Sequence, residues 1–365
     1  MSAVPKTGLI GSILGLSFAV PAYLSRFIKT LLVTTTLIFP AFPSFAADPL
    51  PALRADPTKT SVSGLSSGAF MAVQYEVAFS GSTLGIGVVA GGPYDCVRVN
   101  YGGWANMAIC MQGSPSAFNS YEAAKTFAAE QKIDPITNLA SHKVYLFSGT
   151  EDLVVKQPVM NAVYDFYKLA GVPQANLVYI NTFGAGHGFI SPTFGNLCFT
   201  NYTPYINECM AEGKLYDQPG AILSHIYGQL KAKTASLSAK PIAFNQRELA
   251  PSGIGMAETG YIYIPSSCQN AAANTCKLHI VFHGCAQGAK ATNVGDDVFT
   301  KVGYNEWADT NNIMVLYPQV DPTIVGPPDF LGCWDWVGYT GYDFQIKTGK
   351  QLSAIRAMVD RLTGQ

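Results

Sequence analysis

The chain has 365 residues, of which 48% are apolar and 13% are charged, and its formal net charge is −1. A chain of this length and apolar content can bury a sizeable core. It contains no run of Lys or Arg that could follow a phosphate backbone, and we therefore exclude nucleic-acid binding.

Residues 1–46 have the character of an export leader. Arg26 and Lys29 precede the apolar run "TLLVTTTLIFPAFPSFA", whose final "SFA" places small residues where a signal peptidase reads before cleavage. We expect the leader to be removed, the mature chain to begin at Ala47, and no membrane association after cleavage. An earlier apolar stretch suggests that translation begins near Leu24, with a long leader or a signal anchor as the alternative.

After the leader, strand-like and helix-like patterns alternate along the chain. Strands are predicted just before Ser66 and within residues 84–92, 142–152, 176–189, 260–267, 276–287 and 313–320. Helices are predicted within residues 69–79, 119–132, 158–171, 220–232, 298–312 and 349–362. Residues 191–240 are less regular apart from one helix. This alternation predicts a mostly parallel sheet with helices on both faces.

Ser66 lies between the predicted strand and helix, in "GLSSG", which fits the G-x-S-x-G pattern of a nucleophile elbow. An ordinary Ser/Gly turn would have the same letters, so the strand and the helix around it favour the nucleophile. A serine hydroxyl is a poor nucleophile unless a base removes its proton, and the interpretation requires a histidine and an acid.

His187 is the candidate base, because "GAGHGF" places it in a glycine-rich loop after a strand. His142, His225 and His279 lie in a polar turn, a helix and an apolar strand, where a structural or solvated role is expected. A loop histidine bonded to backbone is the alternative for His187 itself. Asp152 is the candidate acid, with Glu151 as the alternative, because "FSGTEDLVV" follows a buried strand. The order Ser, Asp, His is that of an α/β-hydrolase.

Two backbone amides should stabilise the oxyanion of the tetrahedral intermediate. The first belongs to Ser67, which follows the nucleophile. The second usually follows a His-Gly pair after an earlier strand, but no such pair lies between Ala47 and Ser66. It occurs much later, in "LHIVFHGCAQ", and we interpret Cys285 as the second donor. The spacing of His279 and His283 could suggest a metal pair, but the run is strand-like and lacks the glutamate of a helical zinc motif.

A late oxyanion loop implies that the first strands of the sheet are encoded after its last ones. The chain is then a circular permutant, and one catalytic domain at 47–365 replaces the two domains that a boundary near residue 236 would suggest. The polar residues 232–240 would join the old termini. The last helix would lead back toward the strand before Ser66.

Eight cysteines follow the leader, an even number in a chain bound for an oxidising compartment, and disulfides are expected. Three pairs are close in sequence, which would leave a fourth, although sequence does not fix the connectivity. Zinc binding is the alternative, but no C-x-x-C pair is present. The cysteines are Cys96, Cys110, Cys198, Cys209, Cys268, Cys276, Cys285 and Cys333.

The segments "GLSSGAFMA", "AGGPYDC", "SGTEDLVV", "GAGH", "VFHGCAQ", "YPQV" and "GCWDW", in this order, resemble the polyhydroxybutyrate depolymerases of the circularly permuted, single-domain, fungal type. The resemblance implies a permuted α/β-hydrolase fold. It also implies a Ser66, Asp152 and His187 triad, oxyanion amides at Ser67 and Cys285, and a disulfide between Cys285 and Cys333.

The resemblance further implies that Trp334 and Trp336 line a cleft for a polyester strand, whereas packing in the core is the alternative. We therefore expect a secreted serine esterase, with the periplasm as the alternative location, that acts on poly(3-hydroxybutyrate) or its oligomers without a metal or organic cofactor. A feruloyl or acetylxylan esterase is the enzymatic alternative, and a disulfide-stapled binding protein is the non-enzymatic one. The sequence does not indicate an oligomeric state.

Overall fold

The computed structural model describes residues 47–100, 104–323 and 329–365. The predicted leader lies outside these ranges. The described residues belong to one compact unit. None of their helices is both long enough and apolar enough to cross a membrane.

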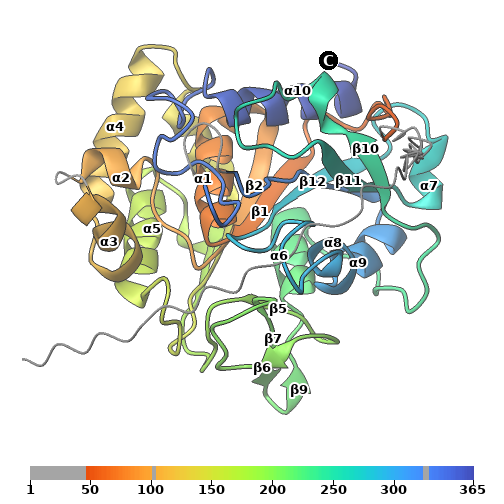
Figure 1. Cartoon of the computed structure of the whole chain (residues 1–365), viewed down its shortest axis with the longest axis horizontal. Coiled ribbons are helices and arrows are strands. Elements are labelled where there is room, and N and C mark those ends of the chain that lie inside the picture. Colours follow the sequence, from red (N-terminus) through yellow and green to blue (C-terminus); the bar gives the residue numbers. More distant parts are fainter. Residues whose placement is uncertain (1–46, 101–103, 324–328) are drawn as a thin grey trace, which may run out of the picture. The chain divides into compact units, whose positions relative to one another are not determined.

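An eight-stranded sheet forms the centre of this unit (Figure 1). In spatial order its strands are β10 (Ile242–Asn245), β11 (Thr259–Tyr263), β13 (Ile313–Tyr317), β12 (Lys277–Phe282), β1 (Thr60–Leu65), β2 (Thr83–Val89), β3 (Lys143–Phe147) and β4 (Leu177–Ile180). β11 is antiparallel to both β10 and β13, and the other neighbours are parallel. The predicted mostly parallel sheet is confirmed.

Strands from the two halves of the chain meet at the middle of this sheet. β1 pairs with β12 on one side, in the register Val62 to Ile280, and with β2 on the other side. Figure 1 shows the orange β1 beside the cyan β12. If counting starts at β10, the spatial order becomes 1-2-4-3-5-6-7-8. The third strand is then β12, whose following loop is the oxyanion loop of an α/β-hydrolase, and the permuted order is confirmed.

Helices cover both faces of the sheet, because apolar residues alternate along each strand. On β12, Leu278 and Ile280 join one core cluster whereas Val281 joins the other. The first cluster includes residues of α1 (Ser67–Ala78), α4 (Ala117–Ala129), α5 (Gln157–Leu169) and α10 (Lys350–Thr363). The second includes residues of α6 (Gln218–Tyr227), α8 (Asp297–Lys301) and α9 (Tyr304–Thr310).

The end of the chain returns to the segment before β1. The Ala55 amide donates a hydrogen bond of 2.8 Å to the Leu362 carbonyl at the end of α10, and the Arg361 guanidinium donates to the Leu50 carbonyl. The last helix therefore leads back toward Ser66, as the permuted arrangement requires.

Some elements differ from the sequence predictions. The single helix predicted at 298–312 is two helices, because Gly303 between α8 and α9 has a φ of 113°. β10 follows directly on the polar joint, where no strand was predicted. The short strand β5 (Phe189–Ile190) lies just before the irregular segment. The segment itself contains the short strands β6 (Asn196–Leu197), β7 (Ile206–Glu208), β8 (Met210–Ala211) and β9 (Lys214–Leu215).

Four disulfides join all eight cysteines. The three pairs close in sequence are bonded, and the fourth bond joins Cys285 to Cys333, as the resemblance implied. Two of these bonds involve short helices, which are α2 (Cys96–Val99), α3 (Trp104–Gln112) and α7 (Ser266–Gln269).

Candidate active site

Ser66 lies at a sharp turn between β1 and α1. Its φ of 57° and ψ of −124° form a conformation that residues with a side chain rarely adopt. A Cβ on Gly64 would lie 2.2 Å from the Gly68 carbonyl oxygen, and a Cβ on Gly68 would lie 2.3 Å from the carbonyl oxygens of Phe282 and His283. Only glycine fits at both positions, which accounts for the spacing of the pattern.

Backbone hydrogen bonds hold this strained turn. The Ser66 amide donates to the Val89 carbonyl at the end of β2, at 3.0 Å. The Ser66 carbonyl accepts hydrogen bonds from the amides of Ala69 and Phe70, which lie in the first turn of α1. The serine is therefore fixed between two strands and a helix, at the edge of the sheet where the parallel strands end.

Asp152 and His187 follow β3 and β4, so their loops leave the same edge of the sheet. Asp152 Oδ2 lies 2.8 Å from His187 Nδ1, and both side chains are buried, with exposed fractions of 2% and 4%. Asp152 Oδ1 accepts hydrogen bonds of 2.8 Å from the amides of Val154 and Val155. Glu151, the alternative acid, is exposed.

The Asp152 carboxylate determines which nitrogen of His187 carries a proton. A carboxylate only accepts hydrogen bonds, so Nδ1 carries the hydrogen that faces it. Nε2 is then the nitrogen that can accept a proton from a hydroxyl group. This is the orientation that a general base requires.

The loop after β12 is held by two buried side chains. Val320 N–H donates to His283 Nε2 at 3.1 Å, so Nδ1 carries the proton and donates to the Gly284 carbonyl at 2.8 Å. Burial lowers the pKa of His283 to about 4, which keeps the ring neutral. Gln287 Oε1 accepts from the Gly284 amide at 2.7 Å.

These contacts fix the peptide group between Gly284 and Cys285. Because a trans peptide is planar, a carbonyl held by His283 directs the Cys285 N–H to the opposite side. A Cβ built on Gly284 would lie 3.4 Å from the Ser66 Cβ. Within the described part of the chain, the amides of Ser67 and Cys285 donate no hydrogen bond to a protein acceptor. Both amides therefore remain free to bind an oxyanion.

Two known proteins that are similar to this chain in sequence are named as polyester depolymerases. The chain is 44% identical over 327 residues to a poly(3-hydroxybutyrate) depolymerase of Delftia acidovorans, in a match that covers 87% of this chain and 62% of the relative. It is 38% identical over 334 residues to a polyhydroxybutyrate depolymerase of Talaromyces funiculosus, covering 87% of this chain and 93% of the relative. The chain belongs to the polyhydroxybutyrate depolymerase family.

The solved structures that are similar to this chain carry the same family name. A PHB depolymerase variant complexed with an R3HB trimer has a TM-score of 0.78 and 36% identity, over 87% of this chain and 99% of that one. The PHB depolymerase of Penicillium funiculosum has a TM-score of 0.77 and 37% identity over the same shares. No family model matches the chain. The chain spans less than two thirds of the Delftia relative but nearly all of the others.

A second Ser–His cluster lies on one face of the sheet, in the core of the protein. His279 Nδ1 lies 2.7 Å from Ser61 Oγ, and its Nε2 lies 2.8 Å from Ser63 Oγ. Burial lowers the pKa of His279 to about 3, and Ser61, Ser63 and His279 have no exposed surface. The cluster has the atoms of a catalytic pair but no access for a substrate, so it is part of the core.

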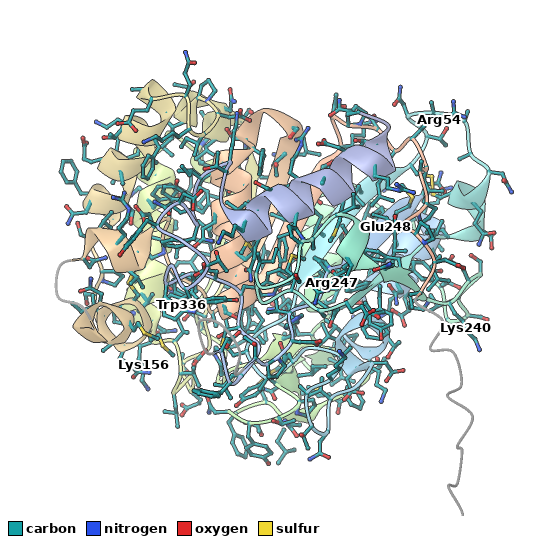
Figure 2. All side chains as sticks on the ribbon, turned by 45° about the horizontal axis from the view of Figure 1, so that its top comes forward. Arg54, Lys156, Lys240, Arg247, Glu248 and Trp336 are labelled. Atoms are coloured by element: carbon teal, nitrogen blue, oxygen red, sulfur yellow. A yellow bond between two sulfur atoms is a disulfide. The ribbon has the colours of Figure 1, made fainter. Side chains whose placement is uncertain are left out.

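The two tryptophans of "CWDW" have different surroundings. Trp334 has no exposed surface and packs against Phe282 and His283. Its ring cannot touch a substrate in this conformation, and packing in the core is the interpretation that fits it. Trp336, labelled in Figure 2, is 7% exposed and stacks on Phe70 of α1 at 4.4 Å.

The remaining histidines are bonded to groups outside the site. His142 Nδ1 lies 2.9 Å from Glu76 Oε1, and His225 Nε2 lies 2.9 Å from the Asn176 carbonyl. Among the described residues, no three His, Cys, Asp or Glu side chains are grouped so that they could hold a metal ion.

Sequence reasoning missed two side chains that hold the site together. Gln287 links the Gly284 amide to the carbonyls of Pro204 and Tyr205, to which its Nε2 donates at 2.8 and 3.0 Å. Asn201 contacts the loops of both Asp152 and His187. Gln287 belongs to the quoted "VFHGCAQ", which was a usable signal. Asn201 has no local pattern that distinguishes it from other loop residues.

Proposed function

We propose that the chain is a serine esterase in which Ser66 is the nucleophile, His187 the base and Asp152 the acid that orients it. One observation carries the proposal, which is the buried 2.8 Å contact between Asp152 and His187 at the sheet edge that also bears the strained Ser66 turn. Such a turn and such a pair are the two parts that a serine hydrolase needs.

In the proposed reaction, Ser66 Oγ attacks the ester carbonyl while His187 Nε2 takes the hydroxyl proton. Asp152 stabilises the imidazolium that forms. The carbonyl oxygen becomes an oxyanion, which the amides of Ser67 and Cys285 bind. His187 then gives the proton to the leaving alcohol, and a water molecule hydrolyses the acyl-enzyme by the same steps.

The proposed substrate is poly(3-hydroxybutyrate) or its oligomers. The names of the relatives support this class, as does the R3HB trimer bound to one of the similar structures. A solid polymer also requires an apolar surface for adsorption. Exposed large apolar side chains occur in the acid loop and in the segment after His187, and they are Leu153, Leu197, Phe199, Tyr202, Met210 and Leu215.

The proposed location is outside the cytoplasm. The leader at 1–46 would be removed, and residues 47–365 would act as a single catalytic domain. Four disulfides support this proposal, because such bonds persist in oxidising compartments.

Replacing Ser66 with alanine tests the proposal. A fluorophosphonate probe should label the wild-type protein and not Ser66→Ala, and the variant should lose polymer and oligomer hydrolysis by about 10⁴-fold or more. Ser61→Ala is the matched control, because Ser61 also contacts a histidine, and it should retain labelling and hydrolysis per folded molecule.

Other outcomes would decide between the alternatives. Labelling that persists in Ser66→Ala would refute the assignment of the nucleophile. A wild-type protein that binds the polymer but takes no probe would be a binding protein. Release of ferulate or acetate from plant-wall esters, without clearing of a polymer suspension, would indicate the other esterase class.

A further inference from the structure

The side chain of Asn201 makes four hydrogen bonds to backbone groups around the candidate site. Its Oδ1 accepts from the amides of Leu153 and His187, each at 2.9 Å. Its Nδ2 donates to the carbonyls of Glu151 and Phe199, each at 3.0 Å. Both lone pairs of Oδ1 and both hydrogens of Nδ2 are therefore used.

These partners allow only one orientation of the carboxamide. Two N–H groups face Oδ1 and two carbonyl oxygens face Nδ2, so a flipped amide would place like groups together at all four contacts. No other common side chain of this length offers a double acceptor and a double donor. The contact is therefore specific to asparagine.

Three of the four partners lie next to the acid and the base. Glu151 and Leu153 are the residues on either side of Asp152, and the third partner is the amide of His187 itself. One side chain thus ties the acid loop, which follows β3, to the base loop, which follows β4. The bond between the two functional side chains is 2.8 Å long and depends on the spacing of these loops.

Asn201 is itself held by the segment around it. It lies within the loop closed by the Cys198–Cys209 disulfide. Asn207 Nδ2 donates to the Thr200 carbonyl at 2.9 Å, and the Gly186 amide donates to the Cys198 carbonyl at 2.8 Å. The disulfide loop therefore packs against the base loop at residues adjacent to Asn201.

We propose that Asn201 is a positioning residue that fixes the separation of the acid and base loops, so that Asp152 keeps its contact with His187 during the reaction. The proposal rests on the proposed function, because it assigns Asn201 a role in that same catalytic pair. A displacement of about 1 Å in such a pair can cost about 10²-fold in rate.

A double-mutant cycle with Asp152 tests this role on the mature protein, with a soluble p-nitrophenyl butyrate ester as the substrate. Asn201→Ala should lower kcat by about 10- to 100-fold and change KM by less than about 2-fold. In the Asp152→Asn background the same substitution should cost less than about 2-fold, because the contact that it disturbs is already lost. A merely structural role would not remove the effect in that background.

Asn196→Ala is the matched control. Asn196 donates to the carbonyls of Tyr202 and Thr203 in the same segment but does not contact the acid or base loop, so kcat should stay within about 2-fold of wild type. If Asn201→Ala does not fold, as judged by its thermal transition, Asn201→Asp replaces it. This variant keeps both accepted bonds and loses both donated ones, and the same cycle applies.

The outcomes separate this inference from the proposed function. An active wild type with an equally active Asn201→Ala would overturn the inference alone. A loss of equal size in both backgrounds would also overturn it, because Asn201 would then act independently of Asp152. A wild type without esterase activity or probe labelling would overturn the proposed function and the inference with it.

Discussion

Burial and bonding partners separate the histidines of this chain into two kinds. His279 and His283 are buried among neutral hydroxyl and backbone groups, and burial lowers their pKa to about 3 and about 4. His187 instead faces the Asp152 carboxylate at 2.8 Å. A positive charge on His187 is therefore compensated, whereas a charge on the other two is not, and of these three only His187 is suited to proton transfer. His142 also faces a carboxylate, that of Glu76, but this pair lies outside the candidate site.

His279 should affect stability through pH rather than activity. Its folded-state pKa of about 3 lies below the unfolded value of 6.5, so its contribution is complete above pH 6.5 and decreases as the pH falls toward 3. The destabilisation of His279→Gln relative to wild type should therefore shrink by about 1–2 kcal/mol between pH 7 and pH 5. Urea unfolding of both proteins at the two pH values measures this change. An equal deficit at both values would show that His279 takes up its proton in the folded state as readily as in the unfolded one.

The sequence indicated the candidate catalytic residues better than the residues that hold them in place. Ser66, Asp152 and His187 each lie in a local pattern of glycine or acidic residues after a strand. Asn201 could not be predicted, because its partners are loops that meet only in the folded chain. The burial of Trp334 also depends on tertiary packing, which the motif does not specify.

At the scale of elements, strands and helices with strong apolar periodicity were predicted close to their observed positions. β10 was not, because a four-residue edge strand gains its conformation from pairing with β11 rather than from its own propensity. The helix at 298–312 was predicted as continuous, since a single glycine is a weak signal against a long helical pattern. The break occurs at Gly303, whose φ is 113°.

Gly68 tests the contact between the elbow and β12. Gly68→Ala would place a Cβ 2.3 Å from two backbone carbonyl oxygens, so we expect a loss of about 2–3 kcal/mol in the free energy of unfolding together with lower activity. Gly184→Ala is the matched control, because its Cβ would meet no atom within 4 Å, and its stability should change by less than about 0.5 kcal/mol. Urea unfolding measures both. A Gly68→Ala protein as stable as the control would contradict the close packing described for this turn.

At the scale of the whole molecule, the order of motifs along the chain predicted the topology. A His-Gly pair that occurs after the nucleophile, rather than before it, implied that β12 lies beside β1, and the sheet has this pairing. Such an inference is possible because the catalytic parts occupy fixed positions on the sheet, whatever their order in the chain. The exposed apolar side chains in the segment that follows His187 were not predictable, since single exposed residues have no periodic pattern.

In the proposed mechanism, an amide from the late half of the chain and a hydroxyl from the early half serve the same reacting carbonyl. The most direct measurement is a crystal structure of the mature protein after reaction with an alkyl phosphonate, whose adduct resembles the tetrahedral intermediate. We expect phosphorus on Ser66 Oγ and the phosphonyl oxygen about 2.7–3.1 Å from the amide nitrogens of both Ser67 and Cys285. An adduct on another residue, or an oxygen directed away from Cys285, would contradict it.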